Sequence, residues 1–103
     1  MNPSNANAVV VVFTIEGCDA CSEYKPRFLK IATQYRNQVP IYILDANSDD
    51  PQVTALAQRL RVSNVPATYV LRKPAGLMSV LGGIPDDQIV WLLGLAAREA
   101  AHQ

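Results

Sequence analysis

The sequence VVVVFTIEGCDAC, residues 9–21, has two cysteines soon after an apolar run. Residues 9–15 are mostly apolar and β-branched, which is the pattern of a strand buried on both faces of a parallel sheet. Gly17 ends this run, and Cys18 and Cys21 follow at the beginning of a helical pattern. We therefore expect a strand, a turn, a pair of thiols and a helix, in that order.

Further strands and helices are expected along the chain. Apolar residues recur at helical spacing over residues 19–36, and Pro26 lies inside this pattern, which predicts a kinked helix. Residues 39–45 predict a second strand, and Pro51 opens a second helix. The next runs, at residues 67–72 and 77–81, predict a hairpin with its turn at residues 73–76.

A last helix is expected after Gly82-Gly83, beginning near Pro85. Asp86 and Asp87 are suited to a helix start rather than to ligand binding. The residues expected to face the sheet are Ile89, Val90, Leu93, Ala96 and Ala97. Trp91, the only tryptophan, is expected to pack in the core.

The order of elements predicts one α/β domain over all 103 residues. Its mixed β-sheet is built as βαβ and then ββα, with helices on both faces. Residues 1–8 are expected to form a flexible leader, and residues 98–103 a tail that frays.

Composition excludes several classes of function. Nine Lys and Arg balance nine Asp and Glu, so the formal net charge is zero and neither nucleic acid nor an anionic membrane is an expected partner. The first eight residues lack the positive charges of a secretory signal, and no apolar stretch approaches the roughly 20 residues of a membrane-spanning helix. We expect a cytoplasmic monomer whose function resides in a local site.

The two cysteines are the strongest candidates for that site. Backbone N–H groups and the macrodipole at a helix start stabilise a thiolate, so Cys18 is the candidate nucleophile. Cys21, one turn deeper, would resolve the mixed disulfide. The alternatives for this pair are half of a zinc site, an inert core pair, or a metal or iron–sulfur site shared across a dimer. No second half of a zinc ligand set accompanies the pair, so no metal is expected.

An ordered set of residues resembles the thioredoxin and glutaredoxin superfamily over about residues 9–93. The set is Phe13, Gly17-Cys18-Asp19-Ala20-Cys21, Pro26, Val65-Pro66-Ala67-Thr68 and Gly82-Gly83. The resemblance implies a thioredoxin-like fold and a cis Pro66 that faces the dithiol. It also implies that the backbone of Val65 pairs with a substrate chain, and that Gly17, Asp19, Gly82 and Gly83 join the substrate-binding residues.

The chain departs from both branches of this superfamily. Thioredoxins usually carry Trp where Gly17 stands, a buried acid where Val12 stands, and a partner lysine among residues 41–44, which are all uncharged here. Proton transfer to Cys21 must therefore use water or another group. Glutaredoxins often carry a basic residue at the position of Ile15, and here Glu16 makes the rim acidic, which disfavours glutathione as a substrate.

The function expected from these features is thiol–disulfide exchange on a disulfide-containing protein. No bound cofactor is expected, since a reductase or a small thiol such as glutathione would supply the electrons. Asp19 puts a carboxylate between the thiols, which disfavours the Cys18 thiolate and so favours a reducing role. The alternatives are a glutaredoxin-type, glutathione-dependent reductase and a thioredoxin-fold interaction module without turnover.

Overall fold

The computed structural model describes residues 7–73 and 76–101. Its sheet has the strand order β2-β1-β3-β4. The central strand β1 (Ala8–Thr14) runs parallel to β2 (Ile41–Asp45) and antiparallel to β3 (Ala67–Arg72). Strand β4 (Leu77–Leu81) pairs antiparallel with β3 at one edge. The predicted mixed sheet is confirmed.

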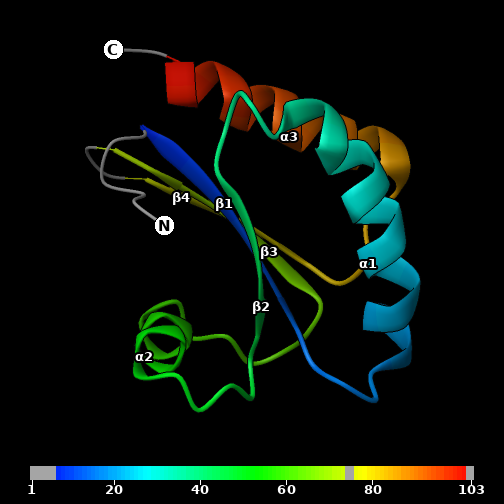
Figure 1. Cartoon of the computed structure of the whole chain (residues 1–103), viewed down its shortest axis with the longest axis vertical. Coiled ribbons are helices and arrows are strands. Elements are labelled where there is room, and N and C mark those ends of the chain that lie inside the picture. The colour runs from blue at the N-terminus through cyan, green and yellow to red at the C-terminus, as the bar shows by residue number, and fades with distance from the viewer. Residues whose placement is uncertain (1–6, 74–75, 102–103) are drawn as a thin grey trace.

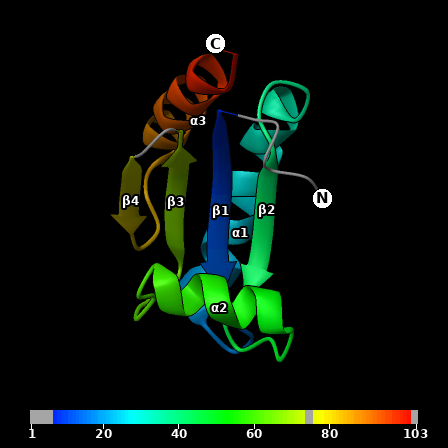
Figure 2. The ribbon, with the colours of Figure 1, turned by 90° about the vertical axis from the view of Figure 1, so that its left-hand side faces the viewer.

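Helices cover both faces of this sheet. Helices α1 (Asp19–Ala32) and α3 (Asp86–Ala101) lie on one face, and α2 (Pro51–Arg59) lies on the other (Figure 1). The short 3₁₀ helix η2 (Thr33–Tyr35) continues from α1. Figure 2 shows α2 crossing the sheet at the end where β1 and β2 finish. The α/β class and the helices on both faces are therefore confirmed, and no described helix is long and apolar enough to span a membrane.

Every residue of β1 is buried, because each face of the strand packs against helices. Val10 and Val12 belong to the apolar layer under α1 and α3, and Val9, Val11 and Phe13 to the layer under α2. A run of β-branched residues suits this position because both faces of the pleated strand are covered. Since β1 is fixed from both sides, its carboxyl end holds the beginning of α1 in place.

Two predictions about α3 are wrong. Trp91 is 60% exposed instead of packed in the core, and Val90 is 45% exposed instead of facing the sheet. The buried face of α3 consists of Ile89, Leu92, Leu93, Ala96 and Ala97. These five residues follow the helical repeat from Ile89, which turns Val90 and Trp91 away from the sheet.

Several boundaries also differ from those predicted. The leader cannot extend to Ala8, which is fully buried in β1 and pairs with Arg72. Helix α3 continues to Ala101, into the stretch expected to fray, and α1 ends at Ala32 because the chain tightens into η2. Residues 1–6, 102 and 103 of the predicted termini lie outside the described residues, as do residues 74 and 75 of the predicted turn.

Candidate active site

Cys18 occupies the N-cap of α1, at the end of the turn that follows β1. Its backbone is extended, with φ −95° and ψ 112°, and its Sγ accepts a hydrogen bond from the backbone N–H of Cys21 at 3.1 Å. Gly17 enters this turn at φ +77°, in the left-handed region that side chains disfavour. The sulfur of Cys18 therefore takes the place of the oxygen that usually caps a helix, facing the free N–H groups of the first turn.

The two thiols differ in their access to solvent. Cys18 is half-buried, whereas Cys21 is only 3% exposed, and both cysteines are free. Burial, and then the neighbouring Cys18 thiol, raise the pKa of Cys21 above its ordinary value, and a backbone hydrogen bond at Ile15 acts in the opposite direction. Cys21 is thus a protonated, enclosed thiol at neutral pH, while Cys18 can be reached from outside.

The loop before β3 lies against the dithiol. The Val65–Pro66 peptide bond is cis, and the Cys18 thiol donates a long hydrogen bond, 3.9 Å, to the carbonyl oxygen of Val65. The backbone N–H of Gly82 donates to the carbonyl oxygen of Pro66 at 2.8 Å. Residues far apart in the sequence therefore meet at one place, although Gly83 faces the side chains of α1 and not the thiols.

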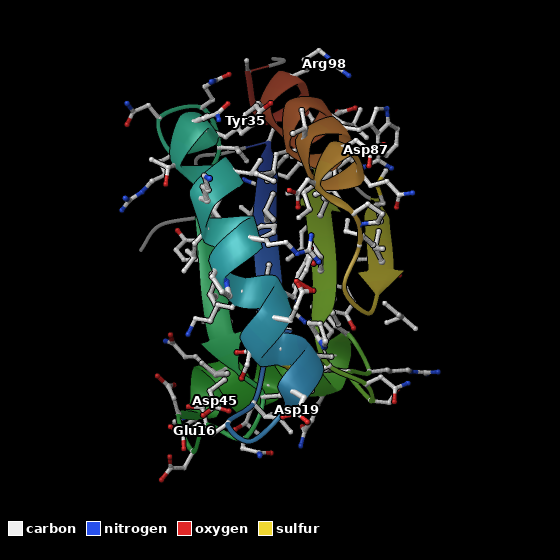
Figure 3. All side chains as sticks on the ribbon, turned by 90° about the vertical axis from the view of Figure 1, so that its right-hand side faces the viewer. Glu16, Asp19, Tyr35, Asp45, Asp87 and Arg98 are labelled. Carbon is white, nitrogen blue, oxygen red and sulfur yellow. The ribbon has the colours of Figure 1, made fainter. Side chains whose placement is uncertain are left out.

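Acidic side chains gather at the same end of the molecule. Glu16 precedes the cysteines in the sequence, Asp19 lies between them, and Asp45 ends β2 at the same end of the molecule (Figure 3). All three are exposed. Three exposed carboxylates therefore lie at the end of the molecule that carries the cysteines.

A cavity of about 330 Å³ lies next to Cys21. Its lining includes the exposed residues Glu16, Lys25 and Asp45, so it reaches the surface. The complete lining is Thr14, Ile15, Glu16, Cys21, Ser22, Lys25, Ile43, Leu44 and Asp45. Because one water occupies about 30 Å³ in the liquid, this space admits several water molecules and offers a route for a proton from Cys21.

Two contacts that α1 makes with later parts of the chain were missed by sequence reasoning. The hydroxyls of Tyr24 and Thr68 share a buried hydrogen bond of 3.0 Å between α1 and β3. Arg27 of α1 bonds to Asp86, which lies 59 residues later in the chain. Spacing could have suggested the pairing of Arg27 with Glu23 on one helix face, but no local signal identifies the distant partners.

Comparison with known proteins gives one family and a consistent fold. The family model described as Thioredoxin matches residues 2–93. No curated protein matches the chain at a significant level.

Solved structures with the same fold include thioredoxins from distant sources. Chloroplastic thioredoxin z aligns with a TM-score of 0.71 and 21% identity, over 92% of this chain and 82% of that one. The oxidised thioredoxin from Plasmodium falciparum gives a TM-score of 0.69 and 21% identity, over 91% and 85% of the two chains. Fasciola hepatica thioredoxin gives a TM-score of 0.74 and 14% identity, over 92% and 86%. These similarities establish a thioredoxin-like fold.

Proposed function

Because the chain belongs to the thioredoxin family, we propose that it is a thiol–disulfide oxidoreductase that reduces disulfides in proteins. The observation that carries this proposal is the position of Cys18. Cys18 is half-buried, and its sulfur caps α1 and lies 3.9 Å from the carbonyl oxygen of Val65, next to the cis Pro66. A thiolate stabilised at a helix start is the species that attacks a disulfide.

In the first step, the Cys18 thiolate attacks one sulfur of the substrate disulfide. A bond forms between that sulfur and Cys18, the substrate S–S bond breaks, and the second substrate sulfur leaves as a thiolate that takes a proton from solvent. Cys18 takes this role because it is the more exposed thiol, whereas burial raises the pKa of Cys21.

In the second step, Cys21 loses its proton to water in the adjoining cavity and attacks Cys18. A Cys18–Cys21 disulfide forms, the mixed disulfide breaks, and the first substrate sulfur leaves in the reduced state. Water fills this role because Val12, at the position of the family's buried acid, is an apolar core residue. An external thiol or a reductase then returns two electrons to the pair.

The substrate is a protein segment rather than glutathione. The Val65–Pro66 loop supplies main-chain groups for an extended peptide, and Leu81, which is 59% exposed and pairs with Ala67, adds apolar surface next to it. Glu16 and Asp19 are exposed near Cys18 and repel the carboxylates of glutathione.

Insulin reduction with dithiothreitol as the electron source tests this function. We expect the wild-type protein to accelerate insulin precipitation and the Cys18→Ser variant to leave it at the uncatalysed rate. If the folded, reduced wild-type protein gave no acceleration, the chain would be an interaction module of this fold and not an oxidoreductase.

A further inference from the structure

Arg27 joins α1 to the segment that connects β4 with α3. Its Nη1 donates to the carbonyl oxygen of Ile84 at 2.9 Å and to Oδ1 of Asp86 at 2.7 Å. Its Nη2 donates to Oε1 of Glu23 at 2.8 Å, and its guanidinium lies 5.6 Å from the centroid of the Tyr24 ring. One side chain therefore bonds to its own helix and to a segment 57 to 59 residues later.

The segment held by Arg27 links β4 with α3 and runs beside α1 (Figure 3). A Cβ added to Gly83 would lie 3.5 Å from the Tyr24 ring and 3.7 Å from Arg27 Nη2, so this backbone packs closely on both side chains. The preceding residue, Gly82, donates its N–H to the carbonyl oxygen of Pro66. Arg27 is therefore linked to the Val65–Pro66 loop through Gly83, which it contacts, and Gly82, which bonds to Pro66. In that loop, the carbonyl oxygen of Val65 accepts the hydrogen bond of the Cys18 thiol.

We propose that Arg27 is a positioning residue for substrate docking, which fixes residues 82–84 against α1 and thereby holds the Val65–Pro66 main chain in place beside Cys18. This inference rests on the proposed disulfide reductase function. Arg27 itself takes no part in the exchange of sulfurs. It acts through the loop that receives the substrate chain.

The chemistry of arginine suits this role. A planar guanidinium has five N–H donors in a fixed arrangement, so it can bond to a carbonyl and two carboxylates at once. A lysine at this position keeps the charge but cannot reproduce that set of directions. Exposed ion pairs add little to global stability, so removal of Arg27 should loosen residues 82–84 without unfolding the domain.

The experiment compares insulin with hydroxyethyl disulfide, a small substrate that needs no extended main-chain contact. In Arg27→Met we expect KM for insulin to rise roughly tenfold, the effect of losing about one charge-assisted hydrogen bond, with kcat unchanged. The rate with hydroxyethyl disulfide should stay at the wild-type value. Arg27→Lys should recover only part of the change in KM.

Two further variants separate docking from the general effects of charge. Lys30→Met removes a cation elsewhere on α1, and it should change neither KM for insulin nor the rate with hydroxyethyl disulfide. Asp86→Asn weakens the bond between α1 and the 82–84 segment from its other side, and should raise KM for insulin by a smaller factor. It serves as the deciding variant if Arg27→Met does not fold.

An unchanged KM for insulin in both Arg27→Met and Asp86→Asn would overturn the inference. Equal losses with insulin and hydroxyethyl disulfide would also overturn it, because they indicate a general structural defect. Failure of the proposed function is a different outcome, in which the wild-type protein itself reduces neither substrate.

Discussion

Replacing Tyr24 by phenylalanine tests how α1 is joined to the strand that follows Pro66. The Tyr24 hydroxyl shares a 3.0 Å hydrogen bond with Thr68 Oγ1, and the two residues are 0% and 1% exposed. Tyr24→Phe keeps the ring and removes one hydroxyl, so the Thr68 hydroxyl stays buried without this partner. Leaving a buried polar group unpaired costs about 1–3 kcal/mol of unfolding free energy.

The reverse change, Thr68→Val, leaves the Tyr24 hydroxyl unpaired and should cost a similar amount. The double variant removes both hydroxyls from the core, so its loss should be smaller than the sum of the two single losses by about 1–3 kcal/mol. This non-additivity separates the hydrogen bond from other effects of each substitution.

Urea denaturation followed by circular dichroism gives the four unfolding free energies, since a domain of this size usually unfolds in two states. Tyr42→Phe is the matched control, because Tyr42 is only half-buried on β2, and its loss should be within about 0.5 kcal/mol. If the Tyr24 and Thr68 losses simply add, the two hydroxyls do not depend on one another and the reasoning is refuted.

Three further predictions concern the dithiol and α3. Iodoacetamide at pH 7 should label Cys18 well before Cys21, because burial raises the pKa of Cys21. Labelling of Cys21 should begin only as the pH rises past the ordinary thiol pKa of about 8.5. Equal labelling of both thiols at pH 7 would contradict this order. Asp19→Asn should raise the reduction potential of the Cys18–Cys21 disulfide by about 15 mV or more, as measured by equilibration with glutathione. This is the effect of removing a charge ~6 Å from the Cys18 thiolate in water. An unchanged potential would show that this carboxylate does not act on Cys18. Trp91→Phe should change the unfolding free energy by less than about 0.5 kcal/mol, because Trp91 is 60% exposed, and a loss above 1 kcal/mol would argue against that exposure.

The sheet and the dithiol could be predicted because their signals are local. A run of β-branched residues marks a strand covered on both sides, and β1 is buried along its whole length. The spacing of Cys18 and Cys21 after Gly17 likewise predicts a turn into a helix, which the structure shows. In these stretches, the pattern of neighbouring residues is enough to predict the element, although the strand itself is completed by pairing with β2 and β3.

Features that depend on contacts between distant parts of the chain could not be predicted from the sequence. Helix α3 carries apolar residues on more than one face, so Trp91 could not be assigned to the surface until the packing of α3 was known. Arg27 and Asp86 meet only because α1 and α3 cover the same face of the sheet. Ala8 is part of β1 because it pairs with Arg72 at the far end of β3, a partner that the leader's own composition does not reveal.

The order of the two thiols is tested most directly by trapping the mixed disulfide. The Cys18→Ser and Cys21→Ser variants are incubated separately with native, disulfide-bonded insulin and quenched with acid. The mass of each intact protein is then measured by mass spectrometry. Because Cys18 is the accessible thiol and Cys21 the enclosed one, Cys21→Ser should accumulate a covalent adduct with an insulin chain, and Cys18→Ser should remain unmodified. An adduct on Cys18→Ser, with none on Cys21→Ser, would contradict the assignment of Cys18 as the attacking group.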